Sequence, residues 1–264
     1  MNNKIEILVA THQSTAIVES GVFKPIQVGA SNNHYTIKND YYKDNTDENI
    51  SEKNSSFNEL TALYWAWKNL NFDIIGLAHY RRYFDLNYKK PFFRKDKAHA
   101  VRNIPENDVR LKILRNEKKI QKKISDLLKT CDIIIPKKAF CTFSSGDFES
   151  LTNQYKRFHI ESDWEVCIEV ILEKYPEYRT SVERYFNHGN ILYLCNMFIA
   201  PKQWFYNYCT WLFDILFEVE KRISISEDPY QRRVIGFLSE RLFTLYILHN
   251  KFKTKELPIL FIEN

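Results

Sequence analysis

Residues 72–84 read FDIIGLAHYRRYF. The apolar half of this stretch, residues 72–77, predicts a buried strand, because a short continuous apolar run is typical of a strand covered on both faces. The strand is followed by His79, Tyr80, Arg81 and Arg82 at its carboxyl end. Charged groups at the end of a buried strand need anionic partners or water. The stretch therefore predicts a sheet strand with an anion site beside it.

Helices and strands alternate along the rest of the chain. The pattern predicts strands at residues 4–10, 26–29, 131–136, 191–200 and 257–262, and helices at residues 56–69, 148–159, 164–175, 204–223 and 231–250. Ser56 and Glu59 have the spacing of a capping box at the start of the first helix. This alternation predicts an α/β fold with a mostly parallel central sheet.

The fold class also predicts where a ligand binds. Ligands of parallel α/β sheets bind outside the carboxyl ends of the strands. Thr11 and His12 follow the first predicted strand, Gly29 closes the second, and residues 79–82 follow the third. We therefore expect these residues to lie around one site.

Two adjacent arginines favour phosphate as the ligand. Arg81 and Arg82 can each hold phosphate oxygens with paired hydrogen bonds, and we expect both to be needed for turnover. The alternative is that one of them pairs with a local carboxylate, Asp85 or Glu59, and only holds the loop in place.

No Asp-x-Asp pair occurs in the sequence. Many nucleotide-sugar transferases use that pair, at the end of a central strand, to hold a divalent cation on the donor diphosphate. Here residues 79–82 occupy the analogous place, and we expect their cationic side chains to stabilise a leaving diphosphate instead of a metal. Asp44 with Asp47, and Asp147 with Glu149, are the alternative metal pairs.

If the reaction is the transfer of a sugar to a hydroxyl group with inversion at the anomeric carbon, it needs a general base. Glu240, which lies on a predicted helix beside Arg241, is the candidate that we select. Glu227 and Asp228 are alternatives in a turn. A purely structural ion pair between Glu240 and Arg241 is the competing interpretation of the same residues.

Composition limits the class of protein and its compartment. The 264 residues can form one large α/β domain, and 44% of them are apolar, enough for a full core. Only six glycines occur, which argues against a glycine-rich phosphate loop. The five cysteines form no Cys-x-x-Cys pair. We also find no leader pattern and no run of about 18 apolar residues, so we expect a cytoplasmic protein with reduced thiols.

Positive charge is concentrated in one segment. Residues 86–125 carry 13 Lys or Arg against 4 Asp or Glu, whereas the whole chain has a net charge of +5. We predict a basic, mainly helical insertion at residues 86–130, within a domain that spans residues 1–264. A polyanion, an anionic lipid surface or phosphates would suit such a segment, and a solvated helix is the alternative. No nucleic-acid-binding motif is present, so nucleic acid is not an expected partner.

Several long motifs carry a resemblance to a known family. They are IQVG (residues 26–29), NISEKN (49–54), ELTALYWAWKN (59–69), GLAHYRRYF (76–84), NMFI (196–199), YCTWLFDIL (208–216) and RVIGFLSERL (233–242). With these motifs, spread over nearly the whole chain, the sequence resembles bacterial capsular and exopolysaccharide biosynthesis glycosyltransferases that were long described as a domain of unknown function. That family includes galactofuranosyltransferase domains.

The resemblance implies a GT-A-like fold without the metal-binding carboxylate pair. It further implies a UDP-sugar donor, an inverting transfer, and neither a metal nor another cofactor. By the resemblance, the residues that would line the donor pocket are Asn49, Ser51, Lys53, Asn54 and Glu59. We add to the expected binding residues Asp44, Asn196 and Arg233, together with Thr11, His12, Gly29 and Tyr80. His79, Arg81 and Arg82 would face the diphosphate. From composition alone, a capped and solvated loop at residues 44–58 is the simpler interpretation.

We expect a galactofuranose or galactose donor and a lipid-linked or oligosaccharide acceptor, with peripheral contact to the inner membrane. Residues 86–125 are not fixed by the resemblance, which leaves the acceptor open. Two other functions remain alternatives. One is a phosphoryl or acyl transferase of the same pathway, and the other is a non-catalytic nucleotide- or glycan-binding module.

Overall fold

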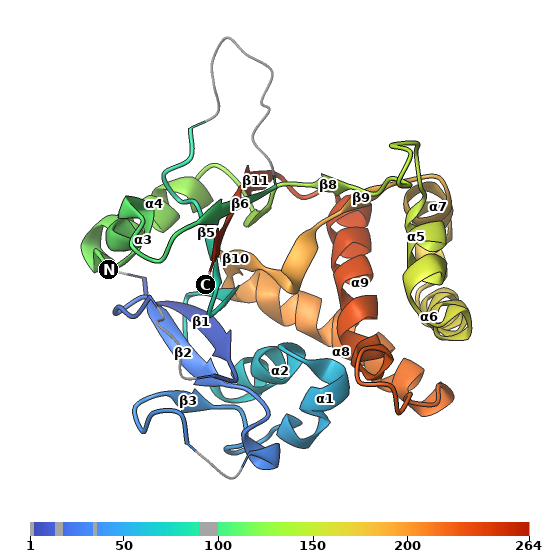
Figure 1. Ribbon diagram of the computed structural model, residues 1–264, viewed down its shortest axis with the longest axis horizontal. Helices are drawn as coiled ribbons and strands as arrows, with labels where there is room; N and C mark the ends of the chain where they lie inside the picture. Colours follow the sequence, from blue (N-terminus) through green and yellow to red (C-terminus); the bar gives the residue numbers. More distant parts are fainter. Residues whose placement is uncertain (1–2, 14–17, 34–35, 90–99, 264) are drawn as a thin grey trace.

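The strand predicted at residues 72–77 is β4 (Ile74–His79), and it lies inside the main sheet. The computed structural model describes residues 3–13, 18–33, 36–89 and 100–263 (Figure 1). β4 pairs in parallel with β1 (Ile5–Thr11), and β1 pairs in parallel with β2 (Phe23–Gln27). The short strand β3 (Tyr42–Lys43) continues this parallel half of the sheet. The α/β class and the mostly parallel sheet predicted from the sequence are confirmed.

The other half of the sheet contains the antiparallel strand. β10 (Phe198–Pro201) runs antiparallel between β4 and β7 (Ile133–Pro136). β11 (Thr254–Leu257) pairs in parallel with β7 and completes the order β11-β7-β10-β4-β1-β2-β3.

Three further strands extend the sheet beside the end of β4. β5 (Arg82–Phe84) turns back from β4 and pairs antiparallel with β12 (Ile259–Ile262). β12 also pairs in parallel with β6 (Val101–Ile104). Strands that are far apart in the sequence therefore meet directly beside residues 79–82.

Helices cover both faces of the sheet. Leu8 and Ala10 of β1 belong to one hydrophobic core and Ile7 and Val9 to another, as the two-residue period of a strand requires. The larger core is covered by α2 (Leu60–Asn69), α5 (Leu151–Phe158), α6 (Glu161–Lys174), α8 (Lys202–Arg222) and α9 (Val234–Asn250). The smaller core is covered by α3 (Val109–Leu114) and α4 (Glu117–Leu128) (Figure 1).

Short elements connect these layers. They are η1 (Ala30–Asn32), η2 (Ser51–Lys53), α1 (Asn54–Phe57), β8 (Ala139–Phe140), η3 (Pro176–Tyr178), α7 (Arg179–Val182), the π-helical turn η4 (Glu183–Asn187), β9 (Ile191–Leu192), η5 (Leu194–Asn196) and η6 (Gln231–Arg233). β8 and β9 form a separate two-stranded antiparallel sheet.

The predicted helix at residues 56–69 is wrong in one respect. The structure divides it into α1 and α2, because Asn58 between them has a φ of 49°. Ser56 does not cap the second helix; its hydroxyl donates to the carbonyl of Lys53. The predicted capping box is therefore absent, although the stripe of Leu60 and Leu63 is buried as expected.

The predicted strand at residues 191–200 is also interrupted. Cys195 and Asn196 have φ values of 69° and 50°, and this left-handed turn separates β9 from β10. An apolar run predicts a continuous strand because nothing in its pattern marks a kink between buried residues. The predicted last strand at residues 257–262 corresponds to β12, whereas β11, which precedes Pro258, was not predicted.

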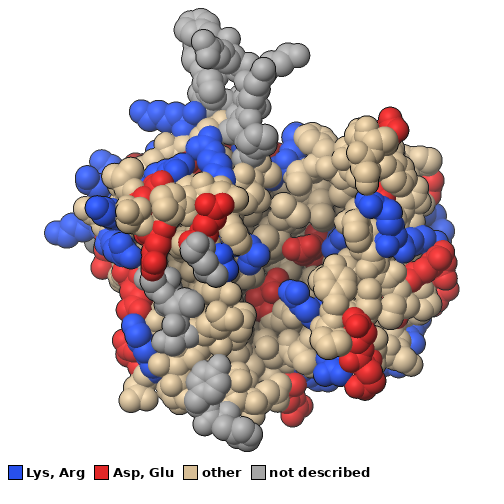
Figure 2. Space-filling view, in the orientation of Figure 1, with Lys and Arg blue, Asp and Glu red and all other residues tan. Residues whose placement is uncertain are grey.

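The basic segment at residues 86–130 is helical from Val109, as predicted, and residues 90–99 lie outside the described residues. Its described part contributes more than an insertion would, since β6 joins the main sheet. Leu111, Leu114, Ile120 and Ile124 are buried in the smaller core. Lys and Arg side chains gather over α3 and α4 on the face shown in Figure 2.

Candidate active site

A pocket of about 450 Å³ opens at the carboxyl ends of β1 and β4. It is lined by Ala10, His12, Val28, Asn54, Asn58, Glu59, His79, Tyr80, Arg82, Cys195, Arg233 and Glu240. Figure 2 shows the molecular surface hollowed near its centre, with acidic and basic side chains in the hollow. The position agrees with the rule that α/β sheets bind ligands beyond the carboxyl ends of their strands.

A tight turn brings a histidine and an arginine into this pocket. His79 ends β4 and pairs across the turn with Arg82, the first residue of β5. Arg82 also pairs with Phe261 of β12, and its guanidinium carbon lies 5.2 Å from the centre of the Phe261 ring. The second arginine of the pocket, Arg233, comes from η6 and donates from Nε to Oδ1 of Asn58 at 3.3 Å.

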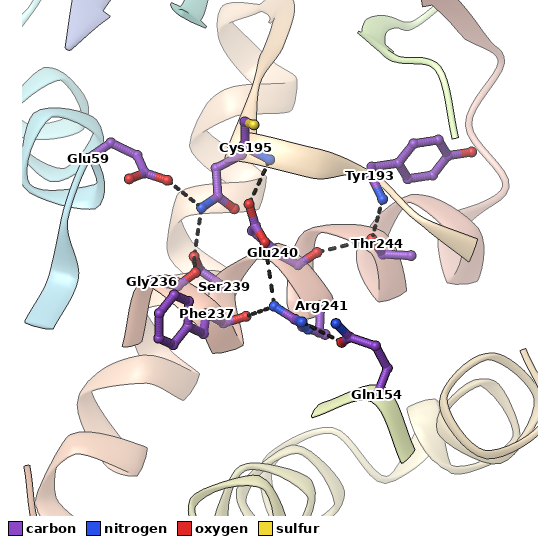
Figure 3. A network of polar contacts seen from close by, with 11 residues as sticks. Glu59, Gln154, Tyr193, Cys195, Gly236, Phe237, Ser239, Glu240, Arg241 and Thr244 are labelled. Atoms are coloured by element: carbon purple, nitrogen blue, oxygen red, sulfur yellow. Dashed lines mark hydrogen bonds and ion pairs between the residues drawn. The ribbon is translucent and has the colours of Figure 1, made fainter. Parts of the chain in front are cut away.

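The left-handed turn at Cys195 connects two pocket residues through its main chain. The Cys195 N–H donates to Oε1 of Glu240 at 2.7 Å (Figure 3), and the Cys195 carbonyl oxygen lies 2.8 Å from Nε2 of His79. A carbonyl can only accept, so Nε2 must carry the proton. In the neutral imidazole the lone pair is therefore on Nδ1.

The next residue in the turn holds the second carboxylate. Asn196 is buried, and its side-chain nitrogen donates to Oε1 of Glu59 at 2.7 Å and to the hydroxyl of Ser239 at 2.8 Å. Ser239 and Glu240 are consecutive on α9 (Figure 3). Two residues with positive φ thus fix Glu59, His79 and Glu240 relative to one another.

Burial shifts the pKa values of the titratable groups in the pocket. Burial raises the pKa of Glu240 above 4.5, and the nearby Glu59 carboxylate adds to this effect, whereas Arg241 opposes it. Burial lowers the pKa of His79, although Glu59 favours its charged form. At neutral pH these directions favour an uncharged His79 and a Glu240 that binds protons more readily than an exposed glutamate.

The structure brings together eight of the residues selected from the sequence. His12, Asn54, Glu59, His79, Tyr80, Arg82, Arg233 and Glu240 all line the pocket. Glu240 also has the ion pair proposed as the alternative, but its Oε2 lies a long 3.4 Å from Nη1 of Arg241. Arg241 is held mainly elsewhere, by the Phe237 carbonyl and by Oε1 of Gln154 (Figure 3).

Arg81 is placed apart from Arg82. Its Nε donates to the carbonyl oxygen of Ile262 at 2.9 Å, and its guanidinium carbon lies 4.9 Å from the centre of the Phe261 ring. Arg81 does not line the pocket, because these contacts direct it to β12. The expectation that both arginines face the same ligand therefore does not fit the geometry.

Another group of selected residues forms a buried polar cluster around Asp44. Its carboxylate accepts from the N–H groups of Gly29 and Ala30 and from the hydroxyls of Ser51 and Thr61. Gly29 has a φ of 63°, a conformation that glycine adopts without strain. Asp44 is completely buried. These contacts support the loop at residues 44–58 from beneath and leave Gly29, Asp44 and Ser51 outside the pocket lining.

Four other selected residues also have structural partners. Thr11 exchanges hydrogen bonds with the main chain of Gln13. Asn49 bonds the main chain of Asp47 and Ser51. Lys53 forms a 2.7 Å ion pair with Glu220. Asn196, as described above, positions Glu59 without itself lining the pocket.

Four lining residues were missed in the sequence: Ala10, Val28, Asn58 and Cys195. Ala10 and Val28 adjoin selected residues at the ends of strands, so the strand-end rule could have included them. Asn58 could have been suspected as a helix break, because asparagine tolerates positive φ. The Asn58 side chain packs against Gly236. A Cβ added at residue 236 would lie only 2.0 Å from Nδ2 of Asn58. Nothing in the sequence marks Cys195.

The two alternative metal pairs have other partners in the structure. The Asp44 carboxylate already accepts the four hydrogen bonds described above. Glu149 is buried and forms a bidentate ion pair with Arg157. Among the described residues, no three His, Cys, Asp or Glu side chains are grouped so that they could hold a metal ion. No helix in the described part of the chain has both the length and the hydrophobicity needed to cross a bilayer.

The fold and the pocket define an α/β protein with a pocket beside its strand ends that is lined by arginines and carboxylates. The chain belongs to the family described as Domain of unknown function (DUF4422), whose model matches residues 6–251. It is also similar to the solved apo structure of WbbM, a bifunctional glycosyltransferase, with 32% sequence identity and a TM-score of 0.85. That match covers 99% of this chain and 46% of the WbbM chain, so this chain spans about half of that protein. No curated protein matches the chain.

Proposed function

We propose that this chain is a glycosyltransferase that moves a sugar from a nucleotide donor to a glycan acceptor. One observation carries the proposal. The pocket combines two arginines, Arg82 and Arg233, with two carboxylates, Glu59 and Glu240, in a chain similar over 99% of its length to a glycosyltransferase structure. The arginines suit a diphosphate, and the carboxylates suit a reacting sugar hydroxyl.

In this proposal the arginines neutralise the leaving group. Arg82 and Arg233 reach the pocket from different segments, β5 and η6, and can therefore contact different oxygens of one diphosphate. Guanidinium groups in a partly buried pocket stabilise negative charge that develops as the nucleotide departs. Because these two cations can neutralise the diphosphate, we propose that the transfer needs no metal ion.

Glu240 is proposed as the general base. It would take the proton from an acceptor hydroxyl while the hydroxyl oxygen forms a bond to the anomeric carbon of the donor sugar. The bond from that carbon to the phosphate oxygen breaks, and the nucleotide diphosphate leaves with the bonding electron pair. A single displacement of this kind inverts the anomeric carbon. The raised pKa of Glu240 suits it to accept the proton.

The donor and the pathway rest on the family resemblance. We propose UDP-galactofuranose or UDP-galactopyranose as the donor, and a lipid-linked glycan of capsule, exopolysaccharide or O-antigen synthesis as the acceptor. The protein would act in the cytoplasm. His12, Asn54 and Tyr80 in the pocket offer polar and aromatic groups for the nucleotide or the sugar.

Contact with the inner membrane face is proposed through α4. A surface groove of about 860 Å³ runs along this helix and includes Lys118, Lys122 and Lys129 beside Glu117 and Asp126. If α4 binds anionic lipid, vesicles containing phosphatidylglycerol will co-sediment the protein, and sodium chloride will weaken the binding. Salt-insensitive binding, or none, would remove the membrane proposal.

The proposed function is tested by thermal shift and donor hydrolysis. The purified protein is screened against UDP, GDP, CMP and their sugars, with and without EDTA. Stabilisation by UDP that survives EDTA, together with slow hydrolysis of one UDP-sugar, is the expected result. Binding without turnover on any donor or acceptor would favour a non-catalytic module. No response to any nucleotide would overturn the donor assignment.

A further inference from the structure

A group of aromatic side chains lies beside the pocket, on α5, on α9 and in the loops that flank α5 and η6. We name Phe143, Phe158, His159, Tyr230 and Phe237 the aromatic rim. Three of its members are strongly exposed for their size: Phe143 at 39%, Phe158 at 44% and Tyr230 at 50% of their surface. Exposed apolar groups that are contiguous, rather than scattered, mark binding surfaces.

The rings of the rim are organised as a stacked group. The His159 ring stacks on Phe237 with centroids 4.1 Å apart and on Tyr230 at 5.7 Å, and Tyr230 and Phe237 are 5.0 Å apart. Arg157 links the other end, with its guanidinium carbon 4.2 Å from the Phe158 ring centre and 5.7 Å from that of Phe143. His159, Tyr230 and Phe237 therefore pack against one another, whereas Phe143 and Phe158 are joined through Arg157.

The rim is continuous with the pocket. Arg233, which lines the pocket, lies three residues after Tyr230, and its guanidinium carbon is 5.3 Å from the Phe237 ring centre. Arg241 connects the same region to α5 through Gln154, so α5 and α9 lie side by side there (Figure 1). A chain-like ligand with one end in the pocket can thus extend over these rings.

From this continuity we propose that the aromatic rim binds the saccharide chain of the acceptor and presents its terminal hydroxyl to the pocket. The inference rests on the proposed glycosyltransferase function. Sugar rings expose flat patches of C–H groups, which carry partial positive charge and pack on the negative face of an aromatic ring. Phe158 and Tyr230, exposed on the rim, offer such faces without needing a particular hydroxyl pattern.

Charges of both signs surround the rim, which suits a saccharide with many hydroxyl groups. Glu227, with 97% of its side chain exposed, forms a 2.8 Å ion pair with Arg232, and Asp228 follows it directly. Carboxylates accept hydrogen bonds from sugar hydroxyls, and guanidinium groups donate to them. Burial and the nearby Arg241 lower the pKa of His159 to about 4, so its ring adds no positive charge at neutral pH.

Substitutions that separate flat stacking from general hydrophobicity test the inference. Tyr230→Leu and Phe158→Leu keep an apolar side chain but remove the aromatic face, whereas Tyr230→Phe keeps it. Val109→Ala, on α3, is the control for loss of a strongly exposed apolar side chain away from the rim. Binding is measured by saturation-transfer NMR, with irradiation of the aromatic protons, against linear galactan, glucan and mannan oligosaccharides of two to six units.

We expect at least one oligosaccharide series to bind the unchanged protein, Tyr230→Phe and Val109→Ala alike. Each leucine variant should bind roughly three- to tenfold more weakly. Equal binding by all variants, or no binding of any saccharide, would overturn the inference. UDP stabilisation of the same samples separates the two proposals: if it persists while saccharide binding is absent, only the rim assignment fails, and if it too is absent, the donor site fails.

Discussion

The main-chain nitrogen of Cys195 lies 2.7 Å from Oε1 of Glu240, and this short contact depends on a backbone conformation that cysteine seldom adopts. With φ at 69°, the same residue turns its carbonyl oxygen towards His79. The positions of the proposed base and of the histidine opposite are therefore coupled through one residue whose side chain makes neither contact.

Substitution of Cys195 should separate the roles of its backbone and its side chain. Cys195→Gly keeps both main-chain hydrogen bonds at a φ that glycine tolerates, so turnover should stay within about threefold of the original and stability should not fall. Cys195→Val places a β-branched residue at positive φ, which should lower the free energy of unfolding by about 1–3 kcal/mol and reduce turnover. Urea unfolding and donor hydrolysis measure the two effects. Equal behaviour of the variants would show that the turn does not position the site.

Arg82→Ala should lose about tenfold or more of the turnover while the fold survives, because it removes a cation from the pocket. Arg81→Ala is the matched variant from the adjacent position. It should instead lower the melting temperature, since Arg81 holds the carbonyl of Ile262, and it should retain UDP stabilisation. The reverse pattern would assign the diphosphate to Arg81.

Glu240→Gln should reduce transfer by about 100-fold or more, the range expected for loss of a general base. The dependence of the transfer rate on pH provides a second test of Glu240. Because burial raises the pKa of Glu240 above 4.5, the base is lost as pH falls through that raised value, so the acidic limb should lie above the range of exposed glutamates. The limb should vanish in Glu240→Gln and stay in Glu169→Gln, which alters an exposed residue of α6. An unchanged acidic limb in Glu240→Gln would place the base elsewhere.

Asp44→Asn should lower the free energy of unfolding by about 1–3 kcal/mol, because an amide nitrogen would face N–H and O–H donors that now meet a carboxylate. Asp40→Asn, at an exposed position nearby, should change stability by less than about 0.5 kcal/mol. Chemical denaturation followed by circular dichroism compares the two. If Asp44→Asn unfolds normally but has a raised KM for the donor, Asp44 binds the donor and its role is not only structural.

The sequence predicted the sheet, most helices and half of the selected site residues for one physical reason. Strand ends in an α/β sheet converge, so His12, His79 and Arg82 could be placed together without knowing any contact. The family resemblance added Asn54 and Glu59. What pattern analysis could not supply was orientation: Arg81 and Arg82 are identical in type, and only the pairing of β5 with β12 decides which of them faces the pocket.

The motif at residues 49–54 shows a second limit. Its polar composition fits a ligand loop and a hydrogen-bonded turn equally well. The structure places Asn54 in the pocket lining, whereas Ser51 bonds a buried carboxylate and Lys53 forms an ion pair with α8. The turn at Cys195 was missed because positive φ in a residue other than glycine leaves no mark in an apolar run.

The pairing of β5 with β12 also has a consequence for how the protein is made. Arg82 and its strand partner Phe261 are separated by nearly 180 residues, so the whole intervening segment must be synthesised before that pair can form. Contacts so distant in sequence form slowly. The β5–β12 pair that holds Arg82 is therefore completed late in folding, and truncation ahead of residue 259 should leave Arg82 without its strand partner.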